Sequence, residues 1–171
     1  IVGYVPQKAV MFSGSVLSNI TFGKNRHGKP SKERVKAAIR VSQAEEFVSK
    51  LDDKEKAHIA QGGTNVSGGQ KQRLSIARTI ARDPEIYIFD DSFSALDYKT
   101  DSTLRSELKK YTKDATVMIV AQRIGTILNA DKIVVLDNGK CVGIGTHKEL
   151  MKKCKVYKEI ALSQVSKEEL E

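Results

Sequence analysis

The sequence contains no tryptophan, three prolines and two cysteines, and aromatic residues make up 6% of its 171 positions. No stretch approaches the roughly 18 consecutive apolar residues of a membrane-spanning helix, so the sequence predicts no transmembrane segment. The first residues, IVGYVPQ, lack the basic and apolar regions of a signal peptide. They also lack an initiating methionine and begin on an apolar run, so we expect the chain to be a piece of a longer protein.

The scarcity of cysteine limits the possible chemistry. Cys141 and Cys154 form no CxxC pair or other metal-ligand spacing, which favours free thiols in a reducing cytosol. The histidines are equally isolated: His27 falls in a turn, His58 in a predicted surface loop and His147 at the expected start of a helix. We therefore expect no disulfide framework and no histidine-based metal site.

Basic residues are in excess, with 29 Lys and Arg against 21 Asp and Glu and a formal net charge of +8. Such a charge permits binding to nucleic acid or to an anionic membrane surface. However, the basic residues are interspersed with acids, as in SKERVKAAIR and KELMKKCKVYKE, and few aromatic residues are available to stack on bases. We interpret them as solvated helix faces and expect no nucleic-acid partner.

The order of apolar patterns predicts an α/β protein. Residues 1–6 are typical of a strand, and helical spacing follows over 15–20 and 31–50. The glycine-rich loop QGGTNVSGGQ then precedes a helix that Asp83-Pro84 ends. This order places an all-helical insert before the second half of an α/β core.

The second half alternates strands with helices. The runs EIYIFD, TVMIVA and KIVVLD are typical of strands in a sheet that is covered on both faces. LDNGKCVGIG predicts a hairpin around Asn138-Gly139, and 146–164 is expected to be helical.

Two short segments carry candidate chemistry. Asp90 and Asp91 stand side by side where a strand ends, which suits either an ordinary turn or a metal and water site. Ser67, Gly68 and Gly69 open a helix, where free backbone N–H groups and the helix dipole favour an anion. A serine N-cap in a glycine-rich loop is the structural alternative.

Four motifs follow one another along the chain: VPQ, VSGGQKQR, IYIFD and SALD. In this order and spacing they resemble the nucleotide-binding domain of an ABC transporter, and VMFSGSVLSNITFG and GTHKELM resemble the exporter branch. The resemblance implies an α/β fold: the C-terminal part of a RecA-like P-loop NTPase core, with a mainly parallel sheet and an inserted all-helical subdomain. It divides the chain into a core strand with the Q-loop at 1–12, a helical subdomain ending in the signature motif and its helix at 13–82, and the remaining core at 83–171. That remaining core would hold the Walker B motif, the D-loop, the switch strand and the C-terminal helix.

The same resemblance implies ATP and Mg²⁺ as cofactors and assigns a role to each matching residue. The metal site would use Asp90 and Gln7. The nucleotide would be bound by Ser67, Gly68, Gly69, Gln70 and Asp97, with the signature residues acting on ATP held by a second nucleotide-binding domain. Asp91 and Gln122 would be catalytic.

Two of these residues depart from the family pattern. Asp91 replaces the glutamate that usually follows the Walker B aspartate, and Gln122 replaces the switch histidine. The shorter carboxylate reaches a water less easily, and glutamine carries no charge. We therefore expect a site with slow turnover, an intact signature that serves the partner's ATP, and a heterodimeric multidrug-type exporter whose other half is non-identical. That partner is expected to carry an altered signature motif opposite Asp91.

The sequence contains no GxxxxGK[ST] loop, which the family places before the Q-loop. We expect the isolated chain to bind ATP poorly and not to hydrolyse it. The complete protein is expected at the cytoplasmic face of a bacterial plasma membrane, joined to a transmembrane domain of the same polypeptide through coupling helices.

Two alternatives remain open. One is a regulatory nucleotide-binding module that does not hydrolyse ATP. The other is a soluble ABC-type ATPase of DNA repair or translation. The continuous spacing from Gln7 to Ser67 argues against the repair enzymes, which interrupt this insert with long coiled coils.

Overall fold

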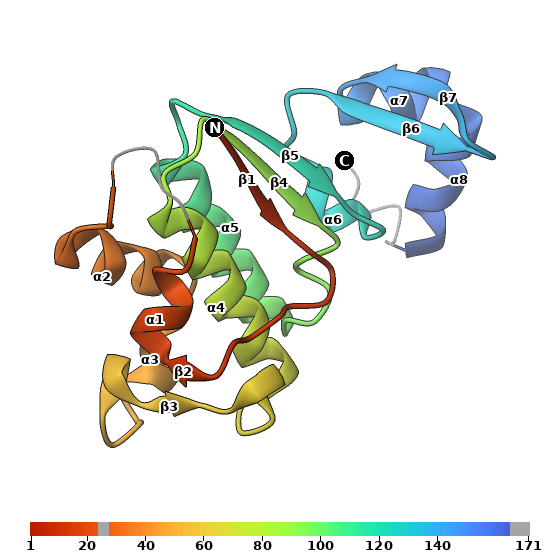
Figure 1. Cartoon of the computed structure of the whole chain (residues 1–171). Coiled ribbons are helices and arrows are strands. Elements are labelled where there is room, and N and C mark those ends of the chain that lie inside the picture. The colour runs from red at the N-terminus through yellow and green to blue at the C-terminus, as the bar shows by residue number, and fades with distance from the viewer. Residues whose placement is uncertain (24–27, 165–171) are drawn as a thin grey trace. The chain divides into compact units, whose positions relative to one another are not determined.

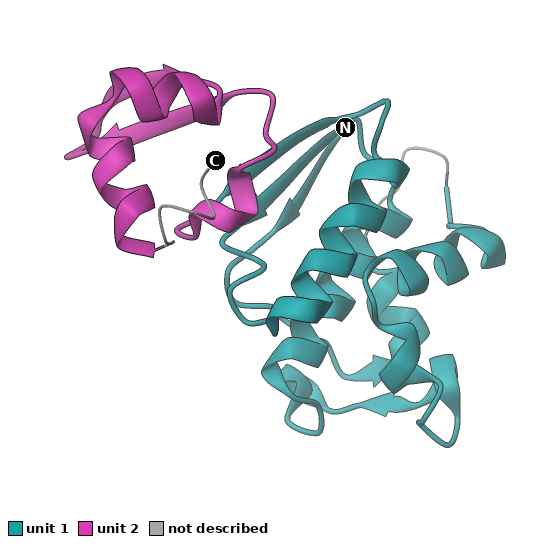
Figure 2. Ribbon diagram, turned by 180° about the vertical axis from the view of Figure 1, so that it is seen from behind, with its two compact units in different colours: residues 1–120 teal, residues 121–171 magenta. Residues whose placement is uncertain are grey.

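The computed structural model describes residues 1–23 and 28–164, and the chain divides into two compact units, residues 1–120 and 121–171 (Figure 2). Each unit has its own cluster of buried apolar side chains. His27, expected in a turn, lies outside the described residues. No helix in the described ranges is long and apolar enough to cross a membrane.

The sheet of unit 1 is parallel, as the sequence predicts (Figure 1). Its strands, in spatial order, are β1 (Val2–Val5), β4 (Ile86–Asp90) and β5 (Thr116–Val120). Val5 lies opposite Phe89, and Asp90 lies opposite Val120. The carboxyl ends of the strands therefore meet at one edge of the sheet, where the four-residue β1 stops just before Pro6.

One face of this sheet packs on helices. Tyr87 and Phe89 are buried on it, whereas Ile88 and Asp90 lie on the opposite face of the same strand and are partly exposed. Helices α4 (Gly68–Ala81) and α5 (Tyr98–Tyr111) follow the glycine loop and β4. A Cβ on Gly3 would lie 2.6 Å from the Thr79 methyl group, so β1 and α4 approach closely there.

The expectation of a sheet covered on both faces is not met among the described residues. On the strands at its two edges, Tyr4 is 51% exposed, Met118 54% and Val120 50%. The apolar runs therefore form strands of the right length, but one face of the unit 1 sheet remains open.

The segment between β1 and β4 is mostly helical. Its elements are β2 (Gly14–Ser15), α1 (Val16–Ile20), α2 (Lys32–Val41), α3 (Glu45–Val48), η1 (Lys54–Lys56), β3 (His58–Ile59) and η2 (Gln61–Gly63). The helical spacing over 31–50 gives two helices, since Gln43 has a φ of 58° and breaks the turn between them. The sequence also did not predict the short antiparallel pairing of β2 with β3.

The described part of unit 2, residues 121–164, contains a hairpin and three helices. They are α6 (Ile124–Ile127), β6 (Ile133–Asp137), β7 (Lys140–Gly145), α7 (His147–Lys153) and α8 (Lys155–Gln164). Asn138 and Gly139 both have positive φ, which confirms the predicted tight turn. Among the described strands β6 pairs only with β7, and the predicted C-terminal helix divides at Cys154, which has extended backbone angles.

Candidate functional site

The two adjacent aspartates occupy the carboxyl end of β4. Asp90 is the last residue of the strand, and Asp91 has a φ of 43°, in the left-handed region that aspartate tolerates better than most residues. The N–H of Asp91 donates to the carbonyl of Val120 over 2.9 Å, so the backbone is fixed in this conformation by β5. The left-handed turn carries the chain away from the sheet directly after Asp90.

Each aspartate accepts a hydrogen bond from the first strand or the loop after it. Gln7 donates from Nε2 to Oδ2 of Asp91 over 3.0 Å, and the hydroxyl of Tyr4 donates to Oδ2 of Asp90 over 2.8 Å. The structure thus brings together Gln7, Asp90 and Asp91, which the sequence analysis had grouped through the family resemblance. Tyr4 was not predicted from the sequence. Its alternation with Val5 along β1 matches that of Asp90 with Phe89 along β4, which could have indicated that Tyr4 and Asp90 lie on the same face of the sheet. The bond to the carboxylate raises the pKa of Tyr4 above its usual value.

The donor set at this edge suits a hard cation. No Lys or Arg forms an ion pair with Asp90 or Asp91 within the described residues, so both carboxylates keep their charge available. Within the same part of the chain, no group of three or more His, Cys, Asp or Glu side chains forms a ready-made metal cluster. Mg²⁺ is commonly held by one or two carboxylates together with substrate phosphates and water, so these residues fit it.

The signature segment forms the start of α4. The hydroxyl of Ser67 accepts from the N–H of Gln70 over 3.2 Å, and the side chain of Gln70 accepts from the N–H of Ser67 over 2.9 Å. This reciprocal capping box confirms the predicted serine N-cap and shows that Gln70 stabilises the helix start. Ser67 and Gly68 are exposed, and a Cβ on Gly68 would meet nothing within 4 Å. A ligand can therefore approach this helix N-terminus from solvent.

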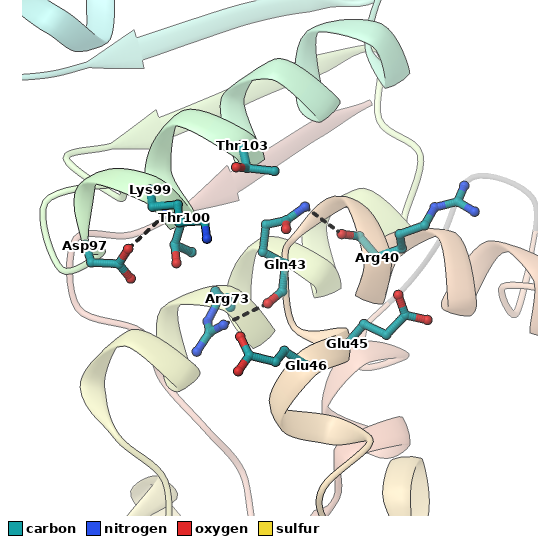
Figure 3. Close-up of a pocket in the computed structure, with 9 residues that line it drawn as sticks. All are labelled: Arg40, Gln43, Glu45, Glu46, Arg73, Asp97, Lys99, Thr100 and Thr103. Atoms are coloured by element: carbon teal, nitrogen blue, oxygen red, sulfur yellow. Dashed lines mark hydrogen bonds between the residues drawn. The ribbon is translucent and has the colours of Figure 1, made fainter.

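Asp97 is the N-cap of α5. Its Oδ1 accepts from the N–H of Thr100 at the start of α5 over 3.0 Å. Hydrogen bonds from Thr100, helped by the nearby charge of Arg73, lower the pKa of Asp97. The side chain lies at the edge of an open polar cavity of about 570 Å³ (Figure 3). Residues lining this cavity are Arg40, Gln43, Glu45, Glu46, Arg73, Asp97, Lys99, Thr100 and Thr103.

Arg73 forms no ion pair with an acid among the described residues. Its guanidinium donates to the carbonyl of Gln43 over 2.8 Å (Figure 3). It also lies 4.9 Å from the ring centre of Phe47. Burial lowers the pKa of Arg73, with Glu46 and Asp97 acting in the opposite direction. The cation therefore ties the signature helix to the break between α2 and α3.

Arg78 is likewise held by carbonyl groups and not by an acid in the described structure. It donates to the carbonyls of Asn19 and Val10 over 2.7 and 3.0 Å, and to Oδ1 of Asn19 over 3.1 Å. Burial lowers its pKa to about 10. Carbonyl dipoles satisfy both arginines, and sequence spacing gives no signal for such partners.

The strand that leads to Gln7 is fixed through its carbonyls. Ser92 donates to the carbonyl of Val5 over 2.8 Å, and Gln72, which is 2% exposed, donates to that of Pro6 over 3.0 Å. Thr79 donates to the carbonyl of Tyr4 over 3.4 Å. The signature helix and the segment after β4 thus both bind the backbone directly before Gln7.

Gln122 belongs to unit 2, where it is exposed. Its carbonyl accepts from Nε2 of Gln164 over 2.8 Å. Its catalytic role stays a prediction.

Comparison with known proteins places this arrangement in a family. A sequence model described as ABC transporter matches residues 1–94, which include the segments VPQ, VSGGQKQR and IYIFD. The chain belongs to the ABC transporter family. It is 45% identical over 163 residues to an uncharacterized ABC transporter ATP-binding protein of Mycobacterium tuberculosis, and 40% identical over 167 residues to the uncharacterized ABC transporter ATP-binding protein YfiB of Bacillus subtilis.

These matches cover 95% and 98% of this chain but 28% of each ABC transporter relative. The structure of a bacterial Atm1-family ABC exporter with ATP bound matches with a TM-score of 0.88 and 32% sequence identity. That match covers 95% of this chain and 28% of the exporter chain. The α/β fold with a mainly parallel sheet and helical insert is therefore that of an ABC exporter ATP-binding domain.

Proposed function

We propose that this chain is the ATP-binding domain of an ABC exporter, in which ATP binding and hydrolysis power transport across a membrane. The observation that carries the proposal is the meeting of Gln7 with Asp91, beside Asp90, at the carboxyl ends of β1 and β4. Open α/β sheets bind their ligands at this edge. The likeness to an exporter with ATP bound supports the same function.

Each residue at this edge has its own role in the proposed function. Asp90 would contact the shell of a bound Mg²⁺, which would neutralise charge on the phosphates. Gln7 has its Nε2 on Asp91, which leaves its carbonyl oxygen as a neutral ligand. Asp91 accepts a proton from, or orients, the attacking water. Gly68 and Gly69 offer their N–H groups, and Ser67 its hydroxyl proton, to the γ-phosphate of ATP bound by a second domain, with Asp97 close to that junction.

We propose further that the site built on this chain turns over slowly. Asp91 has a shorter side chain than glutamate and already accepts a bond from Gln7. Because a misplaced general base costs about 10² to 10⁴ in rate, the active site of the complete protein would be the one that this chain's signature completes in a partner. A non-identical half-transporter supplying Glu and His fits that role.

A surface close to the Q-loop supports an interaction with a transmembrane domain. It contains large apolar side chains that are exposed: Val10 at 55%, Phe12 at 40%, Leu17 at 40% and Phe22 at 51%. Phe12 and Phe22 stack with ring centres 4.2 Å apart, and the Arg78 guanidinium lies 5.3 and 5.9 Å from those centres. This apolar surface suits a coupling helix, which supports a position of the complete protein at the cytoplasmic face of a membrane.

The test uses the complete transporter with its partner, reconstituted in lipid. Wild type is expected to hydrolyse ATP in a Mg²⁺-dependent manner, and the double substitution Ser67→Ala with Gly68→Asp is expected to remove most of that activity. A complete wild-type protein that does not associate with membranes, or that hydrolyses ATP without Mg²⁺, would contradict the proposal. The 171-residue chain alone is expected to bind ATP poorly, since no Walker A motif occurs in it.

A second candidate function is a regulatory module in which ATP occupancy at the Asp91 site controls closure of the two domains without turnover. The bond between Gln7 and Asp91 favours it, because it engages the carboxylate that would otherwise contact the water. Substitution of Asp91 separates the two functions, as described below.

A further inference from the structure

Tyr4 and Asp90 form a pair across two neighbouring strands on the open face of the unit 1 sheet. Tyr4 lies opposite Ile88 in the parallel register, so Asp90 is the next residue on the same face of β4. The phenol reaches along the strand toward the carboxyl edge, where its hydroxyl donates to Oδ2 of Asp90 over 2.8 Å. The neighbouring residues Gly3 and Val5 are buried.

This bond restricts how Asp90 can act. In the described part of the chain, Tyr4 is the one side chain that donates to this carboxylate, and it engages a single oxygen. The other oxygen, Oδ1, stays available for a cation or for a water in its shell. A neutral donor fixes the carboxylate without cancelling the charge that attracts Mg²⁺, whereas a Lys or Arg at the same place would cancel it.

We propose that Tyr4 is a positioning residue for Asp90, holding Oδ2 so that Oδ1 is presented to the Mg²⁺ that accompanies ATP. The inference rests on the proposed function, in which Asp90 contacts the shell of this metal. Hydrogen-bond partners of metal-binding carboxylates orient them, and their loss typically weakens metal affinity or activity about 10- to 100-fold. Because Tyr4 is 51% exposed, its contribution to packing is small compared with its role in positioning Asp90.

The test is Tyr4→Phe in the complete transporter, with Tyr111→Phe as the matched control that removes a hydroxyl elsewhere in unit 1. The affinity for a fluorescent ATP analogue is measured at equilibrium with Mg²⁺ and with EDTA, alongside the melting temperature. Tyr4→Phe is expected to reduce the gain in affinity that Mg²⁺ provides by about 10-fold. Affinity in EDTA and the melting temperature should match wild type, and the control should leave all three values unchanged.

A second comparison tests whether Tyr4 acts through Asp90. In an Asp90→Asn background, adding Tyr4→Phe is expected to change the Mg²⁺ dependence no further. The inference is overturned if Tyr4→Phe retains the wild-type gain, or if affinity falls equally with Mg²⁺ and with EDTA. It is also overturned, together with the proposed function, if the wild-type transporter shows no Mg²⁺-dependent nucleotide binding.

Discussion

Gln7 donates a hydrogen bond to Asp91 across 3.0 Å, although the two residues lie in segments far apart in the sequence. Gln7 follows β1 and Asp91 follows β4, and the parallel pairing of these strands brings both to the same edge. The amide therefore competes with water for the carboxylate. Any rearrangement that turns Gln7 toward a bound metal would release Asp91 at the same time.

The length of the side chain at 91 is expected to control turnover at this site. Asp91→Glu in the complete transporter should raise steady-state ATPase activity by at least several-fold, since a glutamate reaches a water that the aspartate misses. Asp91→Asn should lower the activity only slightly if the site is regulatory and abolish it if this chain catalyses. Phosphate release is the measurement, and an unchanged rate in the glutamate variant would count against a weakened site.

Substitution of Gly68 is expected to lower ATPase activity without lowering stability. A Cβ there meets nothing within 4 Å, and the residue opens α4, so Gly68→Ala should leave thermal stability unchanged or raise it by about 0.5 kcal/mol. The methyl group would nevertheless crowd a phosphate approaching the helix N-terminus, and ATPase activity of the assembled transporter should fall at least 10-fold. Gly125→Ala, also in open space and helical, is the control. Full activity in Gly68→Ala would exclude close contact with the nucleotide.

Arg78 is expected to stabilise unit 1 through its carbonyl partners. Arg78→Ala should lower the free energy of unfolding by about 2 to 4 kcal/mol, because the acceptors on Asn19 and Val10 lose their donor and the two phenylalanine rings lose their support. Arg40→Ala, at an exposed position, should cost under about 0.5 kcal/mol. Urea denaturation followed by circular dichroism measures both, and equal losses would refute this role.

Stability in acid should depend on Asp97. The folded-state pKa of this side chain lies below its unfolded value, so its charge contributes stability that is complete above the unfolded pKa of about 3.9. That contribution is lost as the pH falls through the folded-state pKa. Asn also caps helices but does not titrate in this range.

Melting temperatures of wild type and Asp97→Asn, measured between pH 6 and pH 3, test this dependence. The advantage of wild type should shrink as the pH falls below about 4. A constant difference across this range would show that the charge of Asp97 contributes nothing to the cap.

Local patterns predicted the elements and the caps of this structure well. Ser67 and Asp97 cap the helices that their sequence positions indicate, and the Asn138-Gly139 turn forms as expected. Each of these features depends on interactions within a few residues. The parallel order of the strands also agrees with the family resemblance.

Features set by distant residues could not be predicted in this way. The periodicity over 31–50 continues through Gln43, yet this residue adopts a left-handed conformation and its carbonyl binds Arg73 from another helix. Similarly, the partner of Asp90 is Tyr4, which comes from a strand that only the folded sheet places beside it. The left-handed backbone at position 91 is a further reason for an aspartate there, and side-chain chemistry alone did not indicate it.

The three consecutive carbonyls of Tyr4, Val5 and Pro6 each accept a hydrogen bond from a side chain of another segment. Chimeras that exchange the start of this chain with a relative should therefore be joined before Tyr4. A junction placed after Pro6 would separate these carbonyls from the donors at Gln72, Thr79 and Ser92, and all three donors would have to be supplied by the other parent.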